Sequence, residues 1–273
     1  MDATKAFFRD KAVLVTGASS GIGEELSRQL GLMGARLTLA ARRRDRLEGM
    51  AERIAAEGKP RPAVVECDVT RDGDLERAVR ESVGAFGKLD IAIANAGFGV
   101  IGSMKKLSVQ DYRRQFETNV FGVLRTIYSA LPEIEKTKGN IVIIGSVAGW
   151  VSTPGTSPYA MSKFALRALA NAITPELQHC GVKVTLISPG FVDSNIRRVD
   201  NAGNLHATAG DPVPGWLMMS TEKAVRQILR AVAIGKREAI ITTHGKILVA
   251  VERFVPWVMR VAGKKMAITE TPT

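Results

Sequence analysis

A tyrosine and a lysine lie four positions apart in the stretch SPYAMSKFA, residues 157–165. Ser157 is a favourable N-cap and Pro158 suits the first helical position, so we expect a helix to begin here. Side chains at i and i+4 share one face of a helix, which would bring Tyr159 and Lys163 together. A phenol with its ordinary pKa of about 10 exchanges protons poorly at neutral pH, and a neighbouring ammonium group lowers that pKa. The pair is therefore a candidate for proton transfer, although the same spacing also occurs by chance on helix surfaces.

A second candidate site is the glycine-rich stretch TGASSGIGEEL, residues 16–26, which directly follows the apolar run AVLVT. A turn from a strand into a helix brings backbone N–H groups and the positive end of the helix dipole toward a phosphate. Glycines at positions 17, 21 and 23 allow an approach that a Cβ atom would block. The stretch could be an ordinary strand–helix turn, but its place at the first such turn of the chain favours a dinucleotide-binding site.

Apolar, β-rich runs alternate along the chain with longer segments of helical periodicity. Near-continuously apolar strands between helices are typical of a parallel sheet covered on both faces, and right-handed crossovers then give a doubly wound α/β fold. Such a fold binds its ligands at the carboxyl ends of the strands. The chain has no Pro/Gly/Ser-rich linker and no repeat, so we expect one domain over residues 1–273. The expected strands, about seven, are residues 12–16, 36–40, 63–67, 89–94, 140–146, 182–188 and 238–242, and helices are expected around residues 22–33, 43–57, 72–86, 109–135, 158–179 and 221–233.

Pro175 falls inside the helix expected at residues 158–179. Proline removes a backbone donor from the helix interior and clashes with the preceding turn. We therefore expect a kink or a restart of the helix at this point, with Thr174 as a new N-cap.

The glycine spacing, taken with other motifs in the same order, resembles the short-chain dehydrogenase/reductase family. The match extends from residue 12 to about residue 194, and the ordered set is far more specific than any one motif. The resemblance implies a Rossmann fold, a nicotinamide cofactor and hydride transfer at a carbonyl or alcohol carbon. The motifs are TGxxxGxG from Thr16, NAG at residues 95–97, Asn119 in ETNVFG, Ser146, Tyr159, Lys163, and PG at residues 189–190.

By this resemblance the catalytic residues are Asn119, Ser146, Tyr159 and Lys163. Tyr159 would donate a proton in carbonyl reduction or accept one in alcohol oxidation, and Lys163 would lower its pKa and bind the nicotinamide ribose. Ser146 would hold the substrate oxygen, and Asn119 would anchor a water that relays protons from Lys163 to solvent. The cofactor supplies the hydride, and the protein supplies position and electrostatics.

The end of the second expected strand indicates which nicotinamide cofactor is bound. Enzymes of this fold that prefer NAD usually carry an acidic residue there for the ribose 2′-hydroxyl. This chain has Ala41 followed by three arginines, and a guanidinium group can grip a 2′-phosphate in a fork geometry. We therefore expect NADP(H), with Arg42 as the main 2′-phosphate ligand and Arg43 as the second candidate. The positions that the resemblance assigns to cofactor binding are Gly17, Ser19, Ser20, Gly21, Ile22, Gly23, Arg42, Arg43, Asp68, Val69, Asn95, Ala96, Gly97, Tyr159, Lys163, Pro189, Gly190, Val192 and Ser194.

The net charge of +11 raises the question of a nucleic-acid partner. The basic residues are spread along the chain except for ARRRDR at residues 41–46, and no nucleic-acid motif accompanies that cluster. We therefore expect no nucleic-acid partner. The two cysteines and three histidines form no spaced motif, so we also expect no metal site.

The first ten residues, MDATKAFFRD, contain no apolar core of signal-peptide length, and the chain has no apolar run long enough to cross a membrane. Cys67 and Cys180 are typical of free thiols in a reducing compartment. We therefore expect a cytoplasmic protein.

Two segments of the chain bear on the substrate. In the family that the chain resembles, the loop at about residues 191–220 covers the substrate, and its end, WLMM, is either an apolar wall for a lipophilic molecule or core packing. The C-terminal extension, about residues 243–273, is apolar, flanked by basic residues and interrupted by Pro256. It could be a membrane-surface element, a dimer contact or a cap on the substrate pocket, and we do not favour membrane contact. Several relatives acting on steroids, retinoids or fatty-acyl compounds have extended carboxyl ends, and a lipophilic substrate is expected here by analogy.

Two functions remain open. The favoured one is an NADP(H)-dependent oxidoreductase acting on a CH–OH group: a ketone or aldehyde reductase, or a hydroxysteroid, retinol or 3-oxoacyl type of dehydrogenase. Family members are commonly homodimers or homotetramers through the helices that carry Asn119 and Tyr159, so we expect the same here. The alternative is a non-catalytic NADP(H)-sensing or scaffold protein, but such proteins often lose the tyrosine that this chain retains.

Overall fold

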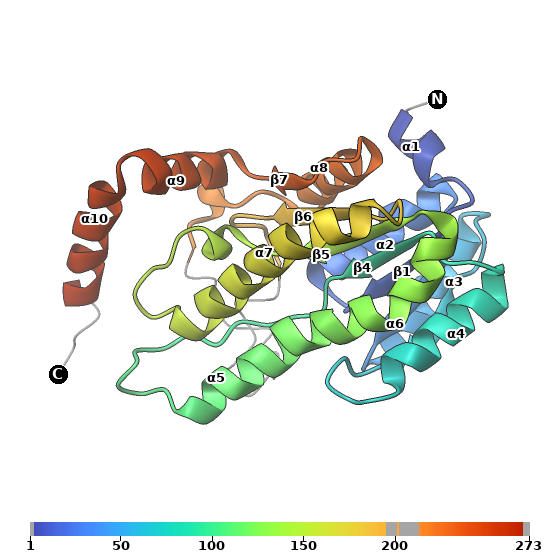
Figure 1. The fold of residues 1–273 in the computed structure, drawn as a ribbon, viewed down its shortest axis with the longest axis horizontal. Helices are drawn as coiled ribbons and strands as arrows, with labels where there is room; N and C mark the ends of the chain where they lie inside the picture. The colour runs from blue at the N-terminus through green and yellow to red at the C-terminus, as the bar shows by residue number, and fades with distance from the viewer. Residues whose placement is uncertain (1–2, 195–200, 202–212, 270–273) are drawn as a thin grey trace.

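The computed structural model describes residues 3–194, 201 and 213–269. Its described strands form one seven-stranded sheet with the order β3-β2-β1-β4-β5-β6-β7, and all neighbouring strands are parallel. Helices cover both faces of this sheet (Figure 1). The expected doubly wound α/β fold is therefore confirmed.

Every expected strand is present, most of them a residue or two shorter than the sequence indicates. Pro256, which we expected to interrupt the C-terminal extension, is the first residue of its second helix. The strands are β1 (Ala12–Thr16), β2 (Arg36–Ala41), β3 (Ala63–Glu66), β4 (Ile91–Ala94), β5 (Asn140–Ile144), β6 (Lys183–Ser188) and β7 (Glu238–Ile240). The helices are α1 (Ala3–Phe8), α2 (Gly21–Met33), α3 (Arg44–Ala56), α4 (Asp74–Phe86), α5 (Val109–Phe116), α6 (Gly122–Thr137), α7 (Ser157–Gln178), α8 (Thr221–Ala233), α9 (Thr243–Phe254) and α10 (Pro256–Thr269), with short helical turns η1 (Glu117–Phe121), η2 (Val147–Gly149) and η4 (Gly215–Leu217).

The core has two layers because side chains alternate across each strand. Val13 and Val15 of β1 belong to a cluster with α2, α3 and α8 on one face of the sheet. Leu14, between them, belongs to a second cluster with α4, α6 and α7 on the other face. Every residue of β1 is buried, which explains why the strand reads as a continuous apolar run.

The strand order reverses next to β1, and this reversal locates the binding site. The chain runs outward from β1 to β2 and β3, then returns to β4 on the other side of β1. The connections after β1 and β4 therefore diverge to opposite faces and leave a crevice at the carboxyl edge of the sheet.

The long helix expected at residues 109–135 is divided into three parts. Ser108 caps α5 through a capping box with Asp111, and α6 carries the chain on to Thr137. Between them η1 is a π-helix that contains Asn119. A π-helix shifts the backbone register by one residue and is frequent at functional sites.

The expected restart at Pro175 is wrong, because α7 continues through this residue to Gln178. Pro175 has no N–H for the Asn171 carbonyl, and Arg237 Nη2 donates to that carbonyl instead, at 3.3 Å. The hydroxyl of Thr174 donates to the Ala170 carbonyl rather than capping a new helix. The start of α7 also differs, since Thr156 is its N-cap and the Ser157 hydroxyl hydrogen-bonds the hydroxyl of another residue, Tyr112.

A buried carboxylate ties β1 to β4 at the amino edge of the sheet. Asp90 is 4% exposed and accepts a hydrogen bond from the Ala12 amide at 2.8 Å. Lys11 and Lys88 make ion pairs with it at 3.1 Å and 2.8 Å. Burial raises the pKa of Asp90, but the bonds from Lys88, Ala12 and Lys11 outweigh it and hold the pKa below its ordinary value.

We expect Asp90→Ala to lower the free energy of unfolding at pH 7 by roughly 2–3 kcal/mol, because it leaves a buried amide and two ammonium groups unpaired. A lowered pKa in the folded state stabilises the fold above the ordinary carboxyl pKa, and this stability is lost as the pH falls through the folded value. The difference between the variant and the wild type should therefore shrink in acid. Urea denaturation at several pH values measures it.

Asp72→Ala is the matched control, since the Asp72 side chain is 95% exposed where it pairs with Arg125. Exposed ion pairs contribute little, so this variant should unfold almost like the wild type. Equal stability of the two variants would contradict the role of Asp90.

Candidate active site

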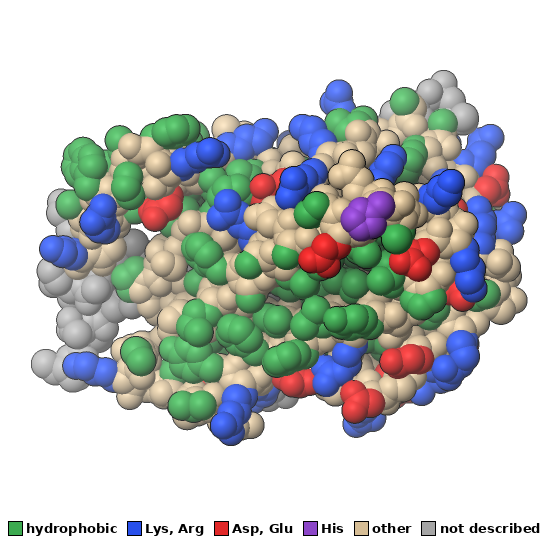
Figure 2. Space-filling view, viewed as in Figure 1, with side chains coloured by type: hydrophobic (Ala, Val, Ile, Leu, Met, Phe, Trp, Pro, Cys, Tyr) green, Lys and Arg blue, Asp and Glu red, His purple; other side chains and the backbone are tan. Residues whose placement is uncertain are grey.

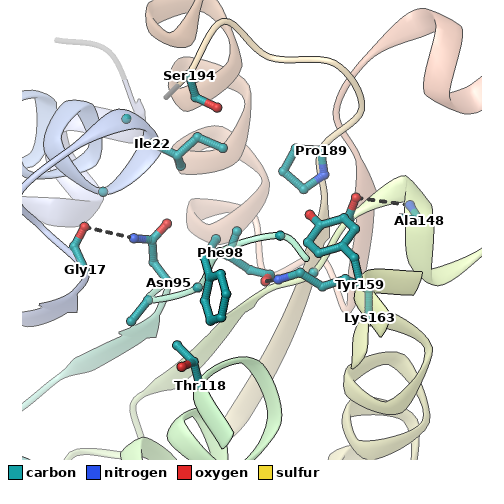
Figure 3. Close-up of a pocket in the computed structure, with 18 of the residues that line it drawn as sticks. Gly17, Ile22, Asn95, Phe98, Thr118, Ala148, Tyr159, Lys163, Pro189 and Ser194 are labelled. Carbon is teal, nitrogen blue, oxygen red and sulfur yellow. Dashed lines mark hydrogen bonds between the residues drawn. The ribbon is translucent and has the colours of Figure 1, made fainter. Parts of the chain in front are cut away.

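A cavity of about 1050 Å³ opens along the carboxyl edge of the sheet (Figure 3). The glycine-rich stretch at residues 16–26 and the tyrosine-bearing stretch at residues 157–165 both line it. Every position that the sequence predicts for catalysis or cofactor binding lines this cavity except Asn119. The lining positions among them are Gly17, Ser19, Ser20, Gly21, Ile22, Gly23, Arg42, Arg43, Asp68, Val69, Asn95, Ala96, Gly97, Ser146, Tyr159, Lys163, Pro189, Gly190, Val192 and Ser194.

The turn between β1 and α2 leaves no room for side chains at two of its glycines. A Cβ atom on Gly17 would lie 2.8 Å from Ala96 Cα, and one on Gly23 would lie 2.3 Å from the Gly17 carbonyl oxygen. Gly17 also has a φ of +65°, a conformation that favours glycine. Ser20 is the N-cap of α2 but makes no side-chain cap bond, so the first N–H groups of this helix stay available to an anion.

Thr16 and Asn95 brace this turn from the neighbouring strand. The Thr16 hydroxyl accepts hydrogen bonds from the amides of Asn95 at 3.0 Å and Ala96 at 3.2 Å. The side-chain amide of Asn95 donates to the Thr16 carbonyl at 2.9 Å and to the Gly17 carbonyl at 3.3 Å (Figure 3). NAG therefore holds the glycine turn in place.

The two arginines that follow β2 have different surroundings. Arg43 packs against the glycine turn and donates to the Ser19 hydroxyl at 3.0 Å and the Ser19 carbonyl at 3.2 Å. Burial, with the nearby Arg46 and Arg42, lowers the pKa of Arg43, which marks a concentration of positive charge. Arg42 is exposed and lines the cavity, so its guanidinium group is open to a ligand.

Asp68 and Val69 form the wall beyond β3. The carboxylate of Asp68 accepts from the Thr70 amide at 3.0 Å and the Thr70 hydroxyl at 2.8 Å. Val69 is buried against the start of α6, where a Cβ atom on Gly122 would lie 2.7 Å from its methyl group. These contacts place both residues at the edge of the cavity that Arg42 also lines.

Two hydroxyl groups reach the cavity, one from Ser146, just after β5, and one from Tyr159 in α7. The Ser146 hydroxyl accepts a hydrogen bond from the Ala148 amide at 3.0 Å, which leaves its own proton to be donated. The Tyr159 ring lies on the same side of the cavity as Pro189, across from Ile22 and Asn95 (Figure 3). The two hydroxyls can therefore meet one substrate oxygen at this side.

Lys163 is the most deeply buried charged group that lines the cavity. It is 6% exposed, and its ammonium donates to the Ile144 carbonyl at 3.0 Å. Its nitrogen lies 5.7 Å from the centroid of the Tyr159 ring. Burial lowers the pKa of Lys163 to about 8, because an ammonium group loses its hydration there.

Asn119 lies behind the cavity wall, fully buried, and its side-chain amide clamps another segment of backbone. Its oxygen accepts from the Phe98 amide at 3.1 Å, and its nitrogen donates to the Phe98 carbonyl at 2.9 Å. Gln115, one turn earlier, does the same by accepting from the Val100 amide at 2.6 Å and donating to the Phe98 carbonyl at 2.8 Å. The two amides hold residues 98–100 as an extended wall, and the water relay through Asn119 stays a prediction.

A family model described as short chain dehydrogenase matches residues 11–204. The chain belongs to the short-chain dehydrogenase/reductase family. It is 35% identical over 226 residues to 11-beta-hydroxysteroid dehydrogenase-like 4A of Arabidopsis thaliana, covering 82% of this chain and 73% of that one. It is also 35% identical over 266 residues to human dehydrogenase/reductase SDR family member 7, covering 94% of this chain and 78% of the relative.

Solved structures of the family share the fold. An alcohol dehydrogenase from the archaeon Thermococcus sibiricus, complexed with 5-hydroxy-NADP, is 25% identical, with a TM-score of 0.73 over 85% of this chain and 96% of that one. A short-chain type dehydrogenase/reductase from Mycobacterium marinum is 27% identical, with a TM-score of 0.75 over 87% and 97% of the two chains. Family membership makes the protein an oxidoreductase of the class that uses nicotinamide cofactors.

The substrate side of the cavity is built partly beyond the residues that the family model matches. His244 and Leu248 of α9 and Met259 of α10 line it, so the C-terminal extension does contribute to the pocket. No simple spacing in the sequence links these residues to the site. Among residues 213–220, none lines the cavity. The interpretation of WLMM as a substrate wall is therefore wrong: Trp216 is 85% exposed, and Met219 packs against the core.

Most of the loop expected to cover the substrate, residues 195–200 and 202–212, lies outside the described residues. Asn201 is described, and its side chain pairs with the Ile101 backbone, accepting from the amide at 3.0 Å and donating to the carbonyl at 2.9 Å. The described helices include none that is long and apolar enough to cross a membrane.

We expect the cofactor-free protein to gain stability between pH 8 and pH 10 through Lys163. Its folded pKa of about 8 is below the ordinary lysine value of 10.5, so in this window the unfolded chain holds a proton that the folded chain has released. Stability then rises with pH. Urea denaturation of the wild type and Lys163→Met across this range measures the effect, and the difference between the two should change with pH.

Lys136→Met is the control, because the Lys136 side chain is 68% exposed in its pair with Glu133. This variant should follow the wild type through the whole range. A pH-independent difference between the wild type and Lys163→Met would show that Lys163 is not a buried ammonium in the folded protein.

Proposed function

We propose that the protein is an NADP(H)-dependent oxidoreductase that transfers a hydride between the cofactor and a carbonyl or secondary alcohol. The observation that carries the proposal is one cavity lined both by the glycine turn with Arg42 and by Ser146, Tyr159 and Lys163. The first group fits a dinucleotide, and the second fits proton transfer at a carbonyl oxygen.

The residues present fit a dinucleotide with a 2′-phosphate. The close backbone at Gly17 and Gly23 and the uncapped start of α2 suit a diphosphate. Ala41 presents no carboxylate to repel a further phosphate, and Arg42 is free to grip one in a fork geometry. Arg43, held against Ser19, adds positive charge beside it. The archaeal relative bound to 5-hydroxy-NADP supports the same choice.

The proton-transfer end is built from three side chains. When bound, the nicotinamide supplies or accepts the hydride. Ser146 donates its proton to the substrate oxygen and holds it beside Tyr159, which donates a proton in reduction and accepts one in oxidation. Lys163, held by the Ile144 carbonyl, keeps positive charge close to the phenol and favours its ionised form. Burial of this ammonium strengthens its effect, because few water molecules screen it.

The substrate wall favours a lipophilic molecule. Phe98, Ile101, Val151, Leu248 and Met259 line the cavity with apolar side chains. The relatives named as hydroxysteroid dehydrogenase-like proteins are consistent with such a substrate. A hydroxysteroid, retinol, 3-oxoacyl or similar lipophilic ketone, aldehyde or alcohol is the proposed class.

We propose a homo-oligomer whose subunits contact one another through the helical segments that carry Asn119 and Tyr159, namely η1 with α6 and α7. Exposed apolar side chains gather on this face, which Figure 2 shows. Tyr128 of α6 is 73% exposed, and Phe121, Met161 and Phe164 are exposed along η1 and α7. Such a surface is typical of a protein interface.

The C-terminal helices leave a second apolar surface exposed, including Phe254, Val255 and Trp257. The basic Arg253 is beside it. Because α9 and α10 also line the cavity, we now place a substrate cap ahead of the other two interpretations of this extension, a dimer contact and membrane-surface contact. The free thiols Cys67 and Cys180 support a reducing compartment such as the cytoplasm.

Arg42→Ala should weaken NADPH binding on the order of tenfold or more, because it removes charge-assisted bonds to the 2′-phosphate. NADH, which lacks this phosphate, should bind almost unchanged. Fluorescence titration with the two cofactors measures both affinities.

Arg44→Ala is the matched control from the same run of arginines, because Arg44 pairs with Glu48 at 3.3 Å and does not line the cavity. It should leave both affinities unchanged. Equal weakening of NADPH and NADH by Arg42→Ala would rule out the 2′-phosphate role.

Tyr159→Phe should lower turnover by about 10²-fold or more, since it removes the proton donor while keeping the ring. The assay is NADPH absorbance with a panel of lipophilic ketones and aldehydes beside small polar ones, and NADPH affinity should stay within about threefold of the wild type. Tyr128→Phe, on the exposed face of α6, is the control. Activity that survives in Tyr159→Phe would refute the mechanism. A wild type that binds NADPH but turns over nothing in the panel would favour the alternative, a dinucleotide sensor or scaffold.

A further inference from the structure

His244 has no part in the proton transfer described above, yet it lines the same cavity. It lies in the first turn of α9, two residues after the N-cap Thr242. Its ring stacks on the Phe191 ring, with centroids 5.3 Å apart and planes at 23°. Phe191 follows the Pro189-Gly190 turn, so this contact joins the C-terminal extension to the end of β6.

Hydrogen bonds determine which ring nitrogen of His244 carries the proton. The Phe191 amide donates to Nε2 at 2.8 Å. The Thr242 hydroxyl lies 3.0 Å from the same nitrogen, and that hydroxyl already accepts from the Gly245 amide at 3.2 Å. A backbone amide can only donate, so Nε2 presents its lone pair to Phe191, and the proton of the neutral ring resides on Nδ1.

The surroundings favour this neutral ring. Burial lowers the pKa of His244. The positive end of the α9 dipole also disfavours an imidazolium in the first helical turn. His244 is therefore a stable acceptor near neutral pH.

The Pro189-Gly190 turn is held from two sides. On one side the Pro189 carbonyl accepts from the Val147 amide at 2.8 Å, next to Ser146. On the other side a Cβ atom on Gly190 would lie 2.5 Å from His244 Nε2, so only glycine allows the histidine to come this close. The turn is fixed between the strand end that carries Ser146 and the ring of His244.

We propose that His244 is a positioning residue. Its neutral imidazole fixes the turn at residues 189–191, so that this wall of the cavity holds the substrate carbonyl within reach of Ser146 and Tyr159. The inference rests on the proposed function for its kinetic consequence. The contact itself is independent of any substrate.

Two substitutions separate the acceptor from the ring. His244→Phe keeps an aromatic ring on Phe191 but removes the acceptor, whereas His244→Gln removes the ring and keeps an oxygen that can reach the Phe191 amide. His179→Phe is the control, because His179 is an exposed histidine at the end of α7, away from the cavity.

The first readout is hydrogen exchange of the Phe191 amide, followed by mass spectrometry on peptides that span residues 186–194. We expect His244→Phe to speed this exchange on the order of tenfold or more, and His244→Gln to restore protection to within about threefold. Unchanged exchange in His244→Phe would overturn the proposal. This measurement needs no turnover, so it stands even when the proposed function fails.

The second readout is kinetic, with a carbonyl substrate from the NADPH panel. His244→Phe should raise KM and lower kcat/KM for the carbonyl on the order of tenfold, since the wall that receives the substrate is loosened. NADPH affinity should fall less than kcat/KM for the carbonyl, because Pro189 and Gly190 are only part of the predicted cofactor site, and the turn after β1 and the arginines lie elsewhere. Rescue by His244→Gln supports positioning through the acceptor. A loss that His244→Gln does not rescue, or a kcat/KM unchanged in His244→Phe, would overturn it.

Discussion

The carboxyl ends of β1 and β4 approach so closely that the backbone itself forms the floor of the site. One buried hydroxyl, that of Thr16, accepts from the amides of Asn95 and Ala96 and donates to the Ile93 carbonyl. Gly17 fits beside Ala96 only because it has no Cβ atom. The reversal of strand order opens a crevice here, and these contacts keep it from splaying apart. The positions of the other cavity features depend on this junction, including the start of α2 and the arginines that follow β2.

The position of Lys163 is the second constraint, and it works against stability. An ammonium group that is 6% exposed has a single described hydrogen-bond partner, the Ile144 carbonyl. The backbone at Lys163 is also closely packed, because a Cβ atom on Gly149 would lie 2.6 Å from the Lys163 carbonyl oxygen. Loss of hydration lowers the lysine pKa to about 8, so the folded chain carries an electrostatic strain. In the proposed mechanism the same burial makes the charge effective toward Tyr159, which would explain why a destabilising group suits this position.

The sequence predicts the strands, their parallel arrangement and the glycine turn well, because these can be inferred from local patterns and from the alternation of strands and helices. β1 reads as a buried strand from its own five residues, and the turn after it reads from its own glycines. Predictions failed where a distant residue intervened. Pro175 did not restart α7, since Arg237 supplies the donor that the proline lacks. The role of Asn119 stays a prediction, and the fold adds what its motif does not indicate, namely that its side-chain amide bonds the Phe98 backbone.

The two halves of the cavity differ in how the sequence encodes them, and this affects what similarity to relatives can tell. A dinucleotide is bound largely through backbone N–H groups, so its half needs short glycine-rich motifs, all within the matched residues 11–204. The substrate half needs only side chains of suitable shape, and α9 and α10 contribute Leu248 and Met259 from beyond that range. Two relatives with equal identity to this chain can differ in substrate, because the apolar wall combines Leu248 and Met259 with residues such as Phe98 and Val151 from within the matched range.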